Sequence, residues 1–187
     1  LGGRLDAVNV IEPSLSIVTT LGLDHQEYLG TSLESIAKEK AGIFRTHQQA
    51  VIGRSACVGT LLAQAAALNV SLCIEGEHFD YDAEHNIWRF GDKTNIKVEH
   101  FLPNCSVSLA MAAYTILGKH YFSLPHLSKV VNSLGHKVMV GRCYPVVINK
   151  RPVIFDVGHN PQGSEWLATT IKKMVPKAKI SAVWASM

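Results

Sequence analysis

Four short clusters of polar residues could do chemistry on an anionic ligand or a metal ion. The first is Asp24 with His25, which follows an apolar run that we predict to be a buried strand. Ligands of α/β sheets bind at the carboxyl ends of strands, where an imidazole can bind a metal and a carboxylate can orient it. The residues alone favour a simpler interpretation, in which Asp24 caps a helix and His25 lies on the surface.

The second cluster contains Lys40, near the end of a predicted helix. A lysine in this position usually extends into solvent and interacts favourably with the helix dipole. The alternative is a buried amine that reacts with carbon dioxide, because the resulting carbamate is an oxygen ligand that suits Mg²⁺. The residues alone favour the solvated lysine.

The third cluster, residues 2–7, holds two glycines and Asp6, a composition typical of a turn. It is not a Walker loop, because it lacks the Gly-Lys-Ser/Thr run that cradles phosphates. The fourth cluster, residues 156–161, is predicted to end a strand and begin a helix.

Asp156 and His159 of the fourth cluster could face one ligand, and the helix start offers backbone N–H groups to an anion. The alternative is a capped helix with Pro161 in its first turn. Upstream, the planar guanidinium of Arg142 matches phosphate oxygens, although a single arginine is more often a surface residue.

The elements that must position these clusters alternate between short strands and helices, which is typical of an α/β protein. Alternation of apolar and polar residues across 79–98 predicts β-hairpins. The predicted strands are 16–21, 49–52, 71–74, 144–148, 153–157 and 180–184, with a turn at 149–152. The predicted helices run from Thr31 or Ser32 to Gly42, then over 58–68, 107–117, 124–134 and 164–175.

The composition argues against several classes of protein. The net charge is +3, and no run of Lys or Arg indicates a nucleic-acid surface. No apolar segment approaches the ~18 residues that cross a membrane, and we expect no secretory signal. The four cysteines are scattered without a CxxC pair, so we expect reduced thiols in a cytoplasmic protein.

Taken in order, the clusters resemble the signature of the folylpolyglutamate synthase/dihydrofolate synthase family of Mur ligases. Order and spacing agree along essentially the whole chain, and five runs in order are far stronger evidence than one. The matching runs are Leu1-Gly-Gly-Arg-Leu-Asp-Ala7, Gly22-Leu-Asp-His25, Glu39-Lys-Ala-Gly-Ile43, Gly141-Arg142 and Asp156-Val-Gly-His-Asn-Pro161.

The resemblance implies two parts of an α/β fold. Residues 1–139 would be the rear of a central ATP-binding domain, with a mixed, mostly parallel sheet, helices and β-hairpins. Residues 140–187 would begin a Rossmann-like C-terminal α/β domain. Because the last predicted strand has no following element, we expect a chain cut from a longer polypeptide.

The resemblance also implies metal and substrate contacts. His25 and Lys40 would be metal ligands and catalytic residues, with Lys40 carried as a carbamate beside Mg²⁺. Leu5, Asp6 and Ala7 would contact the pterin substrate.

The implied nucleotide contacts are Asn104 at adenine, Arg142 at phosphate and Asp156 at ribose. His159 would be a catalytic residue near the incoming glutamate. We therefore expect His25, Lys40 and Asp156 to converge on one cleft between two lobes.

The reaction that the resemblance implies joins L-glutamate to dihydropteroate or to a folate, with ATP and Mg²⁺ as cofactors. ATP phosphorylates a substrate carboxylate, and the amine of glutamate then displaces phosphate from the acyl phosphate. The family's phosphate loop and an acidic Mg²⁺ ligand lie upstream of this segment, so we expect the chain alone to be inactive. Val140 replaces a usual proline, and Gly158 replaces a common alanine.

For the full-length parent we expect a cytoplasmic monomer that acts on small molecules, without nucleic acid or membrane as partner. Two other functions stay open. The chain could be a non-catalytic remnant that binds a nucleotide or a folate, since it has no phosphate loop. It could also come from another Mur-type ligase that adds amino acids to a cell-wall precursor. The sequences of residues 5–7 and 22–25 argue against this, because they resemble the folylpolyglutamate synthase family.

Overall fold

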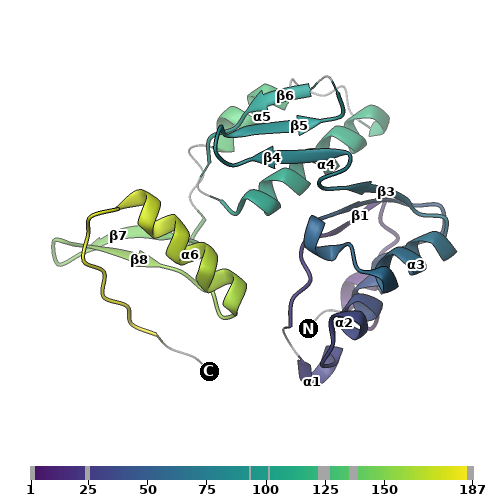
Figure 1. Ribbon diagram of the computed structural model, residues 1–187, viewed down its shortest axis with the longest axis horizontal. Coiled ribbons are helices and arrows are strands. Elements are labelled where there is room, and N and C mark those ends of the chain that lie inside the picture. Colours follow the sequence, from purple (N-terminus) through teal and green to yellow (C-terminus); the bar gives the residue numbers. More distant parts are fainter. Residues whose placement is uncertain are drawn as a thin grey trace.

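The computed structural model describes residues 3–23, 26–92, 94–100, 102–121, 127–134 and 139–184, and it has the mixed α/β architecture that the sequence predicts (Figure 1). Its described strands form a parallel sheet of three strands, an antiparallel sheet of three strands and a two-stranded hairpin. No helix within these ranges is long and apolar enough to cross a membrane.

The parallel sheet lies next to Asp6 and Lys40, two of the predicted site residues. β1 (Leu15–Val18), β2 (Gln49–Ile52) and β3 (Ser71–Ile74) lie in that order. Three residues of the central strand β2 are fully enclosed, as expected of a parallel strand with a continuous apolar run. The predicted bounds of β2 and β3 are confirmed, whereas β1 ends at Val18 rather than at residue 21.

Helices cover both faces of this sheet, α2 and α3 on one side and α4 on the other (Figure 1). α2 (Leu33–Lys40) begins after Ser32, whose hydroxyl accepts from the backbone N–H of Ser35, while the Ser35 hydroxyl accepts from the backbone N–H of Ser32. Such a capping box satisfies N–H groups that a first helical turn leaves without partners, and it confirms the predicted helix start. α3 (Gly59–Ala67) then packs against α2 and the sheet.

The antiparallel sheet and α4 enclose a second core. The sheet confirms the hairpins predicted over residues 79–98, and Trp88 is fully buried between it and α4. The elements are β4 (Phe79–Asp82), β5 (Ile87–Phe90), β6 (Thr94–Lys97), α4 (Asn104–Tyr121) and α5 (Leu127–Leu134). Short helical turns occupy the loops: η1 (Ala7–Val10), α1 (Gln26–Leu29), η2 (Ala41–Ile43) and η3 (Arg54–Ala56).

The C-terminal part consists of β7 (Tyr144–Ile148), β8 (Arg151–Phe155) and α6 (Pro161–Met174). The predicted four-residue turn is wrong. Asn149 and Lys150 alone form the turn, both with positive φ, as in the tight hairpin turns that match strand twist.

The predicted strand at 180–184 is also wrong, because these residues pair with no strand and Val183 is fully exposed. A strand needs a hydrogen-bonded neighbour, and none of the described segments supplies one.

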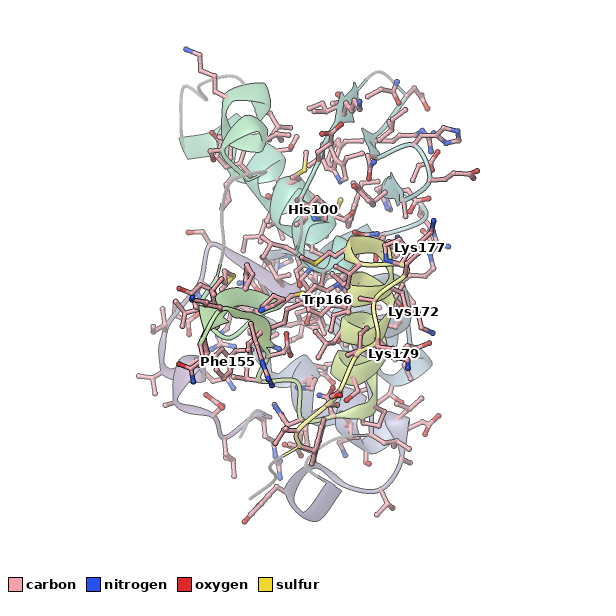
Figure 2. All side chains as sticks on the ribbon, turned by 90° about the vertical axis from the view of Figure 1, so that its left-hand side faces the viewer. His100, Phe155, Trp166, Lys172, Lys177 and Lys179 are labelled. Atoms are coloured by element: carbon pink, nitrogen blue, oxygen red, sulfur yellow. The ribbon has the colours of Figure 1, made fainter. Side chains whose placement is uncertain are left out.

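Figure 2 shows Lys172, Lys177 and Lys179 on α6 and the segment after it, beside the hairpin that carries Phe155. The domain boundary at residues 139 and 140 stays a prediction.

Candidate active site

A cavity of about 220 Å³ lies between the N-terminal segment, the end of β1 and the end of α2. We use "N-terminal segment" for residues 3–12. The cavity opens at the carboxyl end of a parallel strand, the usual place for a ligand in such a sheet. Its lining includes Gly3, Asp6, Asn9, Thr19, Thr20 and Lys40.

Asp6 lies in a closed loop of the N-terminal segment. The carbonyl oxygen of Gly3 accepts from the backbone N–H of Asp6 at 3.1 Å and from the side-chain amide of Asn9 at 2.9 Å. Gly3 has a φ of +91°, which glycine adopts without strain. The carboxylate of Asp6 accepts from the backbone N–H of Val8 at 3.1 Å, so its orientation is fixed at the cavity.

Lys40 is the last residue of α2 and is partly buried at the cavity. Gly42 explains how the N-terminal segment reaches it. A Cβ atom on Gly42 would lie 2.6 Å from Cβ and 2.8 Å from Cα of Arg4, so the segment packs directly on the turn after α2. Asp6 and Lys40, predicted separately, therefore line one cavity.

Thr19 and Thr20 were not predicted as site residues, although both line the cavity. Two hydroxyl side chains directly after a buried strand were the available signal, since that position faces the ligand edge of a sheet. Leu5 and Ala7, predicted as substrate contacts, are exposed on the same loop, Leu5 by 90%, and neither lines the cavity.

The predicted metal ligand His25 lies outside the described residues. The cavity offers oxygen atoms from Asp6, Thr19 and Thr20, and oxygen is the ligand type that Mg²⁺ prefers. Within the described ranges, no group of three His, Cys, Asp or Glu side chains could hold a metal ion. The donors fit Mg²⁺ in type, and a carbamate on Lys40 would add a further anionic oxygen.

Asn104 is the first residue of α4 and is exposed. Its neighbour Cys105 contacts the carbonyl oxygen of Thr19 through Sγ at 3.7 Å, so the start of α4 lies beside the carboxyl end of β1. Burial, followed by the charge of Glu75, raises the pKa of the Cys105 thiol to about 11, which keeps this sulfur protonated near neutral pH.

Asp156 ties the start of the hairpin to its end. One carboxylate oxygen accepts from the backbone N–H of Cys143 at 2.7 Å, and the other accepts from that of Gly158 at 2.6 Å. The backbone N–H of Val157 also donates to the carbonyl oxygen of Gly141 at 2.9 Å. The carboxylate therefore has a structural task that the sequence did not reveal.

His159 and Arg142 lie near Asp156, at the exposed ends of the hairpin and of α6. Nδ1 of His159 is 3.1 Å from the carbonyl oxygen of Val157, and this contact orients the ring. Asn160 caps α6 by accepting from the backbone N–H of Gly163 at 2.9 Å, and Pro161 begins the helix, so the capped-helix alternative is confirmed.

The structure thus forms two groups from the predicted residues. Asp6 and Lys40 share the cavity, whereas Arg142, Asp156 and His159 cluster around the hairpin and the start of α6. Asp156 does not line the cavity that Lys40 lines, so the expected convergence is not seen within the described residues.

Comparison with known proteins decides the family. The chain is 30% identical to a dihydrofolate synthase/folylpolyglutamate synthase of Escherichia coli over 187 residues, which cover 98% of this chain and 43% of that protein. The chain belongs to the dihydrofolate synthase/folylpolyglutamate synthase family. A scan against family models found no match.

Solved members of this family share the fold. An enzyme from Yersinia pestis, complexed with AMPPNP and Mn ion, superposes with a TM-score of 0.79 at 27% identity and covers 94% of this chain and 42% of its own. E. coli FolC, in complex with DHPP and ADP, gives a TM-score of 0.78 at 30% identity and covers 97% of this chain and 42% of its own. The chain spans less than half the length of these family members, and it has their mixed α/β architecture of the Mur-ligase type.

Proposed function

We propose that this chain forms part of an ATP-dependent ligase that adds L-glutamate to dihydropteroate, to a folate, or to both. The supporting observation is the cavity that joins Asp6 and Lys40 at the carboxyl end of β1. Both residues belong to runs that match the family in order and spacing. Solved relatives carry AMPPNP with Mn ion and L-glutamate, or DHPP with ADP, which fits a reaction that uses ATP, a divalent metal ion and L-glutamate.

At the cavity, Asp6 and Lys40 would have separate tasks. Asp6 would hold the pterin, because it lines the cavity and the backbone N–H of Val8 orients its carboxylate. Lys40, as a carbamate, would hold Mg²⁺ together with His25. Mg²⁺ and ATP, when bound, supply the phosphoryl group that activates the substrate carboxylate and the charge that stabilises its transfer.

The C-terminal cluster would hold the nucleotide and the incoming amine. Backbone amides fix the carboxylate of Asp156, which keeps its remaining acceptor positions oriented for a ribose hydroxyl. Arg142 would pair with phosphate and Asn104 with adenine. His159 would lie near the incoming glutamate, and the contact between its Nδ1 and the carbonyl oxygen of Val157 orients the ring.

An assay of ATP consumption tests the proposal on the polypeptide that carries this chain together with a phosphate loop. With Mg²⁺, ADP release should require both dihydropteroate or a folate and L-glutamate. The D6N variant should raise the KM for the pterin substrate and leave the KM for ATP within about twofold, because Asp6 would contact the pterin and not the nucleotide. ADP release that needs neither acceptor nor glutamate would contradict the proposal.

A second candidate is a non-catalytic protein that binds a folate or a nucleotide. It is favoured by the absence of any Gly-Lys-Ser/Thr run from the 187 residues. Calorimetry on this chain with ATP and with dihydropteroate, together with the ATP assay on the longer polypeptide, separates the candidates. Binding of either ligand without ATP turnover by the longer polypeptide supports the second one. A ligase for cell-wall precursors would bind neither dihydropteroate nor folate.

The proposed ligase would be a cytoplasmic monomer. None of the four cysteines forms a disulfide, and Cys73 and Cys143 are buried, which suits a reducing compartment. Sedimentation of the purified chain tests the oligomeric state, and cell fractionation tests the location.

A further inference from the structure

We propose that Arg45 is a positioning residue for the cavity. Its guanidinium holds the segment that carries Asp6 against the helix end that carries Lys40. The inference rests on the proposed function for its effect on substrate, but its structural part can be measured without any substrate.

One side of the Arg45 guanidinium binds the N-terminal segment. Nη2 donates to the carbonyl oxygens of Asn9 at 2.7 Å and of Ile11 at 3.2 Å, and Nε donates to the carboxylate of Glu12 at 3.1 Å. Glu12 is 79% exposed, so this ion pair alone contributes little. The directed bonds to backbone carbonyls therefore account for most of the attachment.

The other side of the same guanidinium binds the turn that follows α2. Nη1 lies 3.1 Å from each of three successive carbonyl oxygens, those of Gly42, Ile43 and Phe44. The carbonyls at the end of a helix lack partners within the helix, and a charged donor satisfies them well. One side chain thus bridges two segments that lie more than thirty positions apart in the sequence.

Arg45 is itself held in place by a buried glutamine. The side-chain oxygen of Gln48 accepts from the backbone N–H of Arg45 at 3.1 Å and from the hydroxyl of Ser16 at 2.8 Å. The side-chain amide of Gln48 donates to the carbonyl oxygen of Pro13 at 2.6 Å. Because Ser16 belongs to β1, this network fixes Arg45 relative to the strand whose end lines the cavity.

The effect on the site follows from Asn9, because Arg45 binds the Asn9 carbonyl oxygen and Asn9 lines the cavity. The Asn9 side chain is bonded to Gly3, and the loop between them carries Asp6. Release of Asn9 would let Asp6 move relative to Lys40. A displacement of about 1 Å in a reacting site costs up to about a hundredfold in rate.

The test compares the R45Q and R45K variants with the R89Q variant. All three are made in the polypeptide that carries this chain together with a phosphate loop. Arg89 is a matched control, because it is an exposed arginine on β5 with an ion pair to Asp82 and is not part of the cavity. Hydrogen exchange should accelerate about tenfold or more at the amides of residues 6, 9 and 11 in R45Q but not in R89Q. R45K should resemble R45Q, because lysine lacks the planar fork that reaches both segments.

A second measurement separates positioning from a loss of stability. In R45Q and R45K, the KM for dihydropteroate should rise about tenfold or more, while the KM for ATP should stay within about twofold. Unchanged exchange at residues 6–11, or full recovery of dihydropteroate KM in R45K, would overturn the inference. A wild-type protein that neither binds nor uses dihydropteroate would overturn the proposed function instead, and the exchange result would still decide whether Arg45 positions the segment.

Discussion

Gly42 allows the N-terminal segment to lie directly on the turn after α2. A methyl group there would approach Cα of Arg4 to 2.8 Å, and a backbone atom cannot move away without its segment. We expect Gly42→Ala to lower the free energy of unfolding by about 1–3 kcal/mol, as overpacking does. Urea denaturation measures this loss, and weaker dihydropteroate binding should accompany it.

Gly59→Ala is the control for this substitution. Gly59 begins α3, and a methyl group on it would have no heavy atom within 4 Å, so only helix propensity changes. Alanine is the better helix former, which predicts equal or slightly greater stability. Equal effects of the two substitutions would show that the contact with Arg4 is unimportant.

Lys40 can be tested through its ability to form a carbamate, which arginine does not share. Lys40→Arg keeps the positive charge at the end of α2 but cannot form a carbamate. If a carbamate helps to hold the metal, ligase activity should fall by about a hundredfold or more, while the urea midpoint stays unchanged. Lys38→Arg, on an exposed position of the same turn, should keep its activity. Activity of K40R within about twofold of the wild type would rule out this role.

Single residues of the site differ in how readily the sequence reveals them. Asp6 and Lys40 carry charges within short motifs, so their chemistry could be predicted from neighbours in the chain. Arg45 has no such motif of its own, because its role depends on carbonyl groups of residues 9 and 11, which only the fold brings close. Asp156 was predicted as a ligand contact, but its bonds to backbone amides depend on the hairpin geometry.

At the scale of elements, the turn between β4 and β5 should respond to acid through Asp82. Hydrogen bonds from the His85 ring, from the His85 backbone N–H and from Arg89 lower the pKa of Asp82 from 3.8 to about 2. A lowered folded pKa means that the ionised carboxylate stabilises the turn above about pH 4, and that this contribution is lost as pH falls towards 2.

Asp82→Asn should therefore be less stable than the wild type at neutral pH. The difference should shrink between pH 4 and pH 2, because the wild-type carboxylate is neutralised over this range. Urea midpoints measured at several pH values check this. Asp92→Asn, in the next turn, serves as the control, and a constant difference for D82N at all pH values would contradict the prediction.

Elements were predictable where local signals and packing agree. Apolar runs predicted the bounds of β2 and β3 correctly, and the serine cap predicted the start of α2 correctly. The hairpin turn was misjudged because Pro152 suggested a turn, whereas the edge of a two-stranded hairpin tolerates a proline opposite Val147. The apolar run at 180–184 has strand composition, but composition alone supplies no neighbouring strand.

At the scale of the whole molecule, β2 joins two hydrophobic cores. Ala50 and Ile52 face the core formed with α2 and α3, while Val51 faces the core formed with α4 and the antiparallel sheet. The two cores share a strand that is buried on both faces, so we expect them to unfold together. Among the described residues from 139 onward, Cys143 is the single buried apolar residue, and it belongs to neither core, so we expect this part to unfold separately.

Hydrogen exchange on the intact chain should separate these units. Amides of β2 and of β5 should exchange with a similar, high free energy of opening, because both lie in the joined cores. Amides of β7, β8 and α6 should open at a lower free energy, since Val147 and Phe155 are exposed and little apolar surface is enclosed there. That boundary in protection should fall near residue 140, where the sequence predicts a new domain. Equal protection on both sides would mean that the C-terminal hairpin and α6 belong to the same cooperative unit as the parallel sheet.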